Sequence, residues 1–119
     1  MIVSKPNPSL FLGSVATSVH APSFRCFVST ARRSLFSSVW ETVIFGGDPG
    51  VDREWKACAR FRYRPSLNKQ SIWQIHAGMS ERMNALAESG KGLGEVLSLV
   101  LPDLVQRNII EQSSIRSAF

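Results

Sequence analysis

Residues 54–64 alternate between apolar and basic side chains, and this pattern restricts the fold of the chain more than any other feature. One side of such an alternation carries five apolar residues: Trp55, Ala57, Ala59, Phe61 and Tyr63. The other side carries four cations and a cysteine: Lys56, Cys58, Arg60, Arg62 and Arg64. A period of two is typical of a β-strand with one face on a core and the other in water. We therefore predict a basic strand here, followed by a turn at residues 65–68.

The 119 residues provide one domain of ordinary size. No apolar run is long enough to span a membrane, so we expect no membrane partner. The formal net charge of +5 is uneven, because residues 1–40 hold four cations and no acid, while residues 41–119 hold ten cations against nine acids. The cations clustered on one strand are therefore better evidence for an anionic partner than the total charge is, although a solvated edge would also carry such charges.

The two cysteines, Cys26 and Cys58, are too few for a disulfide framework and indicate a reducing compartment, so we expect a cytoplasmic protein. Together with His20 and His76 they make four candidate metal ligands. Their spacing matches no zinc pattern, and we therefore expect neither a metal nor another cofactor.

No spacing in the chain supports catalysis. The glycine-rich segment at residues 90–94 lacks the Lys-Ser or Lys-Thr ending of a phosphate loop and follows a helical pattern instead of a strand. Neither a Ser-His-acid nor a Cys-His grouping can be argued, and no two carboxylates share a face. We expect a binding protein and not an enzyme.

The first 22 residues are rich in Ser and Pro and contain no acid, and we expect them to form a poorly ordered arm. An acid-poor, Ser-rich start would also suit an organelle transit peptide, which would then cover residues 1–38. We favour the arm, because Arg is missing from the first two dozen residues and no amphipathic helical pattern is present. Residues 114–119 are expected to be a polar tail.

Residues 24–30 are rich in Phe, Val and Thr and predict a short strand, with Arg32 and Arg33 in the turn after it. From Ser34 the apolar residues recur at steps of three and four, which favours a helix capped by Ser34 and ended by Gly46 and Gly47. The β-branched content of the same segment also allows a strand, but the periodicity favours the helix.

After the basic strand, residues 69–75 are predicted as its antiparallel neighbour and residues 76–78 as a loop. A helix capped by Ser80 follows, running to Val100 before Pro102, with an alternative in which it breaks at residues 89–92. Residues 105–112 are the last predicted strand. The fold class is therefore α+β: a curved antiparallel sheet with helices packed on one face, formed by a domain of residues 23–113.

Several short motifs occur in an order that belongs to a known family. A Trp with a following Glu-Thr (Trp40-Glu41-Thr42) precedes two glycines, and the basic strand then leads to Arg64, with Lys69 five residues on and Trp73 four further. In this order and spacing, residues 23–113 resemble the translation initiation factor 4E family, which binds the messenger RNA cap. The family's long helix, Leu-Pro and closing strand have counterparts in residues 80–112.

The resemblance implies a partial cap-binding-factor-like fold in which Arg25, Arg64 and Lys69 hold the cap phosphates and Trp73 touches the methylated edge of the guanine. The family also stacks the base between two Trp rings that come earlier in its chain, and no Trp precedes position 40 here. Two lost stacking contacts of about 1–3 kcal/mol each predict a weakened affinity for the cap. This missing part also allows the chain to be an incomplete or alternatively spliced product.

On this basis we expect a non-enzymatic, translation-initiation-factor-like protein whose partner is capped messenger RNA or other RNA. Trp40 and Glu41 match the helical side on which the family docks peptides, so an initiation-factor scaffold or a repressor peptide is a further expected partner. Trp40 would otherwise belong to the core. The alternatives are a protein-interaction module of the translation machinery and a small nucleic-acid-binding protein imported into an organelle.

Overall fold

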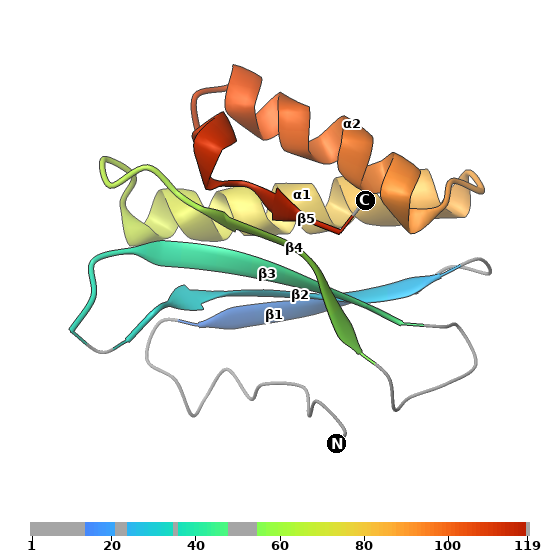
Figure 1. Ribbon diagram of the computed structural model, residues 1–119, viewed down its shortest axis with the longest axis horizontal. Helices are drawn as coiled ribbons and strands as arrows, with labels where there is room; N and C mark the ends of the chain where they lie inside the picture. Colours follow the sequence, from blue (N-terminus) through green and yellow to red (C-terminus); the bar gives the residue numbers. More distant parts are fainter. Residues whose placement is uncertain (1–13, 21–23, 35, 48–54, 119) are drawn as a thin grey trace.

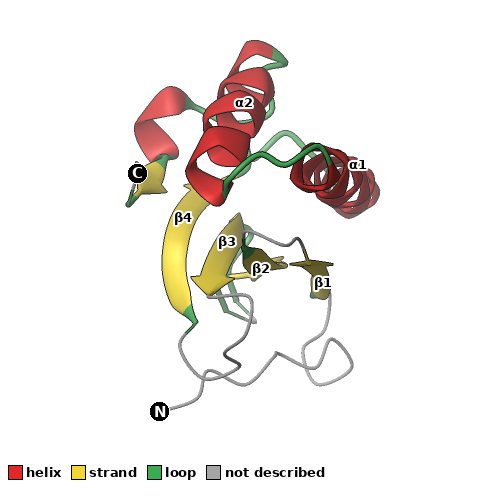
Figure 2. Ribbon diagram, turned by 90° about the vertical axis from the view of Figure 1, so that its right-hand side faces the viewer, coloured by secondary structure: helices red, strands yellow, loops and turns green. Residues whose placement is uncertain are grey.

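The computed structural model describes residues 14–20, 24–34, 36–47 and 55–118. They form a five-stranded antiparallel sheet of order β1-β2-β3-β4-β5, with two helices packed on one face (Figures 1 and 2). The strands are β1 (Val15–His20), β2 (Arg25–Arg32), β3 (Trp40–Gly47), β4 (Lys56–Arg62) and β5 (Arg116–Ser117). The helices are α1 (Lys69–Glu88), α2 (Leu93–Gln106) and the short 3-10 turn η2 (Gln112–Ser114). The α+β class is confirmed, with an antiparallel sheet and helices on one side.

The order of the elements differs from the predicted one. Four consecutive strands come first, and the two helices and the short β5 follow (Figure 1). The predicted strand at residues 24–30 and the basic strand at residues 54–64 correspond to β2 and β4. The strand β1 lies within the segment expected to be a poorly ordered arm, and β5 lies within the expected polar tail. The rest of the arm, residues 1–13, lies outside the described residues.

The helix predicted from Ser34 is wrong, because this segment contains the central strand β3. In β3 the buried residues alternate, with Thr42, Ile44 and Gly46 facing the helices. Its neighbours β2 and β4 both pair with it, so the backbone hydrogen bonds of β3 are satisfied on each side. Val43 and Phe45 on the other face are also apolar. Apolar residues on both faces therefore also recur at steps of three and four, which is the spacing that predicted a helix.

The strand predicted at residues 69–75, and the loop after it, are also wrong, because both belong to α1. Its N-cap is Asn68, whose side-chain Oδ1 accepts a hydrogen bond from the Ser71 N–H at 2.8 Å, and Ser80 lies inside the helix. The residues that α1 buries are Ile72, His76, Met79, Ser80, Met83 and Ala87. They recur at steps of three and four from the first turn onward, so one continuous face packs on the sheet.

The alternative that broke the long helix at residues 89–92 is confirmed. Gly90 has φ +92°, a left-handed conformation that suits glycine, and α2 begins at Leu93. The predicted stop before Pro102 and the strand at residues 105–112 are wrong, because α2 continues through Pro102 to Gln106. Ile110 then makes one isolated bridge to Tyr63 before η2 and β5.

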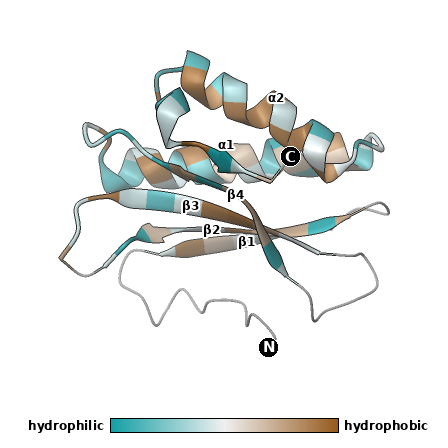
Figure 3. Cartoon of the chain, viewed as in Figure 1, coloured by the Kyte–Doolittle hydropathy of each residue, from teal (hydrophilic) through white to brown (hydrophobic). Residues whose placement is uncertain are grey.

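The hydrophobic core lies between the sheet and the two helices. Its largest fully buried side chains come from both layers: Ile44, Phe61, Ile72, Met83, Leu97, Leu104 and Ile110. Hydrophobic and hydrophilic segments alternate along both helices, as expected for helices with one face on a core (Figure 3). This packing fixes which face of each strand is available for function.

A chain of five hydrogen-bonded side chains crosses this core. His76 of α1 contacts Thr17 through Nε2 at 2.9 Å and Thr30 through Nδ1 at 2.7 Å. The hydroxyl of Thr30 then meets that of Thr42 at 2.6 Å, and Thr42 meets the Tyr63 hydroxyl at 2.8 Å. Burial lowers the pKa of His76 from 6.5 to about 4 and raises the pKa of Tyr63. The imidazole is therefore neutral at physiological pH.

Candidate nucleic-acid interface

The face of β4 that points away from the helices carries two exposed arginines, Arg60 and Arg62. Successive residues on one face of a strand are about 6.6 Å apart, so the two guanidinium groups form a short row. Arg116 of β5 is the Cα partner of Arg60 and extends this row to the next strand. The interface thus gathers three cations from two strands.

Lys56 does not belong to this row, although the strict alternation placed it there. The register between β3 and β4 shifts between Ile44 and Phe45, and Lys56 pairs with Gly46, whose position faces the helices. Such a bulge moves the residues beyond it to the other face of a strand. The cation predicted at Lys56 is exposed, but it lies on the opposite side from Arg60 and Arg62.

Carboxylates neutralise this row only weakly. Arg60 Nε lies 3.8 Å from Glu41 Oε1, which is too long for a hydrogen bond. In the described part of the chain, no carboxylate lies within 4.0 Å of Arg62 or Arg116. The row therefore keeps a net positive charge and would attract an anion.

Just beyond the end of β4, a cavity of about 290 Å³ surrounds Arg64. It is lined by Val39, Arg62, Tyr63, Arg64, Pro65, Glu111 and Ser114. The backbone N–H of Arg64 donates to the Ile109 carbonyl at 3.0 Å, which fixes the base of the side chain. One arm of the guanidinium donates to Glu111 Oε1 at 3.2 Å, whereas the buried Nε has no acceptor among the described residues.

An oxyanion is the natural acceptor for a guanidinium group, and a charge-assisted hydrogen bond to it is stronger than a neutral one. Arg62 lines the same cavity and adds a second positive charge, while Ser114 adds a hydroxyl. The cavity at Arg64 is therefore suited to bind one phosphate group, with Glu111 as the carboxylate already present.

The tryptophans predicted to be functional lie at this same end of the sheet. Trp40 and Trp73 pack edge to face, with ring centroids 5.1 Å apart and an interplanar angle of 81°. Arg32 lies over the Trp40 ring and Lys69 over the Trp73 ring, each at 5.8 Å from the centroid. The Trp40 carbonyl accepts a hydrogen bond from the Tyr63 N–H at 3.0 Å, which places the pair next to the cavity at Arg64.

Lys69, Trp73 and Trp40 thus lie together at this end of the sheet, on its helix side, but none of them lines the cavity at Arg64. In β2, Arg32 pairs with Trp40 and Arg25 pairs with Gly47, so seven residues separate the two arginines. At about 3.3 Å per residue this is about 23 Å. Arg25 is only 6% exposed and lies over the Trp55 ring at 4.6 Å from its centroid. Arg25 therefore cannot contact the phosphate held near Arg64.

The partner-docking helix expected at Trp40 and Glu41 is absent, because both residues belong to β3. Consecutive strand residues point to opposite faces, so Trp40 packs on the helix side while Glu41 lies on the outer face near Arg60. Trp40 is half-buried against the core. These two side chains cannot form one docking surface.

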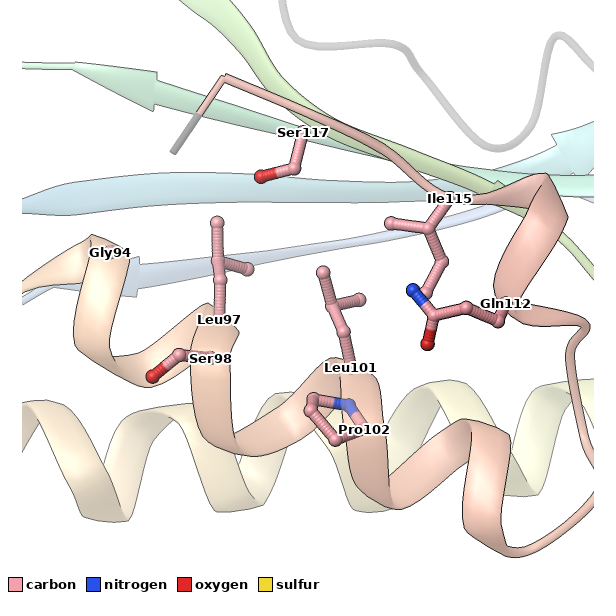
Figure 4. A pocket seen from close by; sticks show the side chains of 8 residues that line it. All are labelled: Gly94, Leu97, Ser98, Leu101, Pro102, Gln112, Ile115 and Ser117. Carbon is pink, nitrogen blue, oxygen red and sulfur yellow. The ribbon is translucent and has the colours of Figure 1, made fainter.

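Another cavity, of about 250 Å³, lies between α2 and the C-terminal segment (Figure 4). Leu97 and Leu101 of α2 point toward this segment, and Ile115 lies opposite them (Figure 4). The described residues that line this cavity are Gly94, Leu97, Ser98, Leu101, Pro102, Gln112, Ile115 and Ser117. None of these is charged, so, unlike the cavity at Arg64, they offer no cation to hold a phosphate.

Sequence reasoning missed Arg116, Glu111 and Ser114. They belong to the segment expected to be a final strand and a polar tail, and only long-range pairing brings them to β4. A local pattern in the sequence carries no signal for such a pairing.

Comparison of the chain with known protein families, curated proteins and solved structures finds no match. In the part of the chain that the structure describes, no helix is long and apolar enough to cross a membrane. The same part contains no cluster of three or more His, Cys, Asp or Glu side chains that could hold a metal ion.

Proposed function

We propose that this protein binds RNA through its phosphates, at the end of the sheet where Arg64 lies. The observation that carries the proposal is the cavity at Arg64, which is lined by two arginines, Arg62 and Arg64. A phosphate group there would accept charge-assisted hydrogen bonds from their guanidinium groups.

The row of arginines on β4 and β5 supports a polymer over a single small anion. Arg60 and Arg116 lie farther along the same outer face and do not line the cavity at Arg64, so one phosphate cannot reach all of these cations. A nucleic-acid strand carries one phosphate per nucleotide and can follow such a row. Trp40 and Trp73 are only partly buried and lie at the same end of the sheet, so their rings could meet a base.

Recognition of the methylated cap is a narrower part of the proposal and rests on the resemblance. Trp40 and Trp73 pack against each other at 81°, which leaves no slot between parallel rings for a base. The arrangement therefore favours phosphate contacts over a stacked guanine, and we propose weak cap selectivity. Cys26 and Cys58 are both free thiols, which supports a reducing compartment such as the cytoplasm.

The test is fluorescence anisotropy of a labelled single-stranded RNA, measured with the full chain at several salt concentrations. Arg64→Gln and Arg62→Gln should each weaken binding by about tenfold, and each should reduce the salt slope by about 0.7, as expected for one lost phosphate contact. Arg107→Gln is the matched control, because it removes one exposed positive charge from the C-terminal end of α2.

The control should change the affinity by less than twofold. Equal losses of affinity in all three variants would show that only the net charge of the chain matters and would contradict a site at Arg64. A wild-type chain that does not bind RNA at low salt would overturn the proposal. Unmethylated and methylated cap analogues, compared as competitors, report on cap selectivity separately.

A further inference from the structure

The short strand β5 brings two like charges together. Arg116 is the Cα partner of Arg60 across the β4–β5 ladder, and like charges directly opposite each other destabilise a sheet. Only two residues of β5 pair with β4, and the Ala118 N–H adds one hydrogen bond to the Cys58 carbonyl at 2.9 Å. A weakly attached strand therefore carries a repulsive pair.

A cavity of about 280 Å³ lies at this pair. It is lined by Ala57, Cys58, Ala59, Arg60, Arg116, Ser117 and Ala118. Both arginines are exposed, and among the described residues the nearest carboxylate to either is Glu41, 3.8 Å from Arg60. Since a water occupies about 30 Å³, the cavity has room for a phosphoryl group with part of an attached sugar.

We propose that this cavity binds a phosphoryl group between Arg60 and Arg116, and that the bound anion fastens β5 to β4. A phosphoryl group between the two guanidinium groups would turn their repulsion into two charge-assisted contacts. Because both arginines face the cavity only when β5 is docked, the anion binds the docked form, and the stabilisation of that form grows with the logarithm of the anion concentration once the site is mostly filled.

This site is separate from the cavity at Arg64, because neither Arg60 nor Arg116 lines that cavity and Arg64 does not line this one. The inference therefore does not need the cavity at Arg64, although it shares Arg60 and Arg116 with the row of arginines that RNA is proposed to follow. It assigns a conformational role to the C-terminal segment: a small phosphorylated ligand would hold β5 against β4.

Inorganic phosphate added to the ¹⁵N-labelled full chain is the direct test, with sodium chloride at matched ionic strength as the control for screening. We expect saturable shifts of the Arg116 and Ala118 amides, and slower hydrogen exchange of the Ala118 N–H as phosphate increases. Arg60→Gln and Arg116→Gln should abolish saturation, whereas Arg62→Gln and Arg64→Gln should retain it.

Arg116→Gln also tests the repulsion without any ligand. Its Ala118 amide should be protected in phosphate-free buffer at least as well as in the wild-type chain, because the like-charged pair is gone. Lower protection of the Ala118 amide would show that Arg116 holds β5 by another contact, and it would overturn the proposal that an anion holds β5 against β4.

The phosphoryl group could come from a nucleotide or from free phosphate, and adenosine monophosphate, with adenosine as its control, distinguishes the two. Tighter binding of the monophosphate than of inorganic phosphate identifies a nucleotide as the ligand, and equal binding identifies the free anion; both outcomes support the site. An equal response to sodium chloride, or saturation that survives in Arg116→Gln, would overturn it.

Discussion

The buried imidazole of His76 predicts that the fold loses stability as the pH falls below neutrality. His76 is 2% exposed, and both of its ring nitrogens contact threonine hydroxyls. Because burial lowers its pKa from 6.5 to about 4, the unfolded chain binds a proton between these two pH values and the folded chain does not. The contribution of the neutral, buried His76 ring to the stability of the fold is therefore complete above pH 6.5 and is lost as the pH falls toward 4.

The magnitude follows from the size of the shift. Each unit of pKa corresponds to about 1.4 kcal/mol, so the complete effect is about 3 kcal/mol in the free energy of unfolding. Within the window the slope should approach one proton, or about 1.4 kcal/mol per pH unit. For a small domain this is a substantial fraction of the total stability.

Urea unfolding at a series of pH values between neutrality and pH 4 measures this slope. His76→Gln keeps a polar side chain of similar size but cannot titrate, so its slope should be shallower than that of the wild-type chain by about one proton. Carboxylates that titrate at lower pH are present in both proteins and cancel in the difference.

The reasoning is refuted if the two slopes agree. An NMR titration of the wild-type His76 ring gives a second answer that does not depend on the variant folding. A ring that titrates near 6.5 in the folded protein would show that burial does not control its charge.

Three further predictions concern local packing. Gly46→Ala should destabilise the fold by about 1–3 kcal/mol in urea unfolding, because the new Cβ would lie 2.6 Å from Cys58 Sγ and 2.7 Å from Leu93 Cδ2, and adding Cys58→Ala should recover part of this loss. Asn68→Ala should cost about 1 kcal/mol in the same assay, since it removes the cap of α1, and an unchanged stability would contradict the assignment of the cap. Burial raises the pKa of Cys26 to about 12 while Cys58 is partly exposed, so a neutral thiol reagent should label Cys58 alone in the native protein, and rapid labelling of Cys26 would show that its strand opens.

The sequence predicted the strands whose two faces differ most clearly. Along β4, apolar Ala59 and Phe61 alternate with Arg60 and Arg62, so the period of two is visible without any neighbours. The α+β class followed from combining such strands with the helical pattern of residues 80–100. The same reasoning placed Lys56 on the wrong face of β4, because the bulge depends on how β3 and β4 pair and cannot be seen in the sequence.

The wrong assignments at β3 and at the start of α1 have different causes. β3 is the central strand and is apolar on both faces, so its contacts with β2 and β4 override the helical spacing of its apolar residues. In residues 69–75 the apolar residues Trp73 and Ile75 suggested a strand, while the capping residue, Asn68, was assigned to a turn. A side chain that suits both a turn and an N-cap gives an ambiguous local signal.

For the candidate site, the sequence identified the residues of one strand and the helix after it, but not their distant partners. Arg64, Lys69 and Trp73 were expected as site residues from the resemblance to the cap-binding family, and they lie at one end of the sheet. Arg25 was placed with them although it lies at the other end of β2. Arg116 was missed because its approach to Arg60 depends on the return of the chain after α2.

The most direct test of the account is to map the RNA-binding surface by amide chemical shifts. Single-stranded RNA added to the ¹⁵N-labelled full chain should shift the amides of Arg62, Arg64 and Ser114 most strongly, and the exposed face of α2 should remain unchanged. In Arg64→Gln these shifts should need about tenfold more RNA to reach half of their maximum under the same salt conditions. Shifts confined to other parts of the chain, or shifts at Arg62 and Ser114 that reach half of their maximum at the same RNA concentration in Arg64→Gln, would contradict a phosphate site at Arg64.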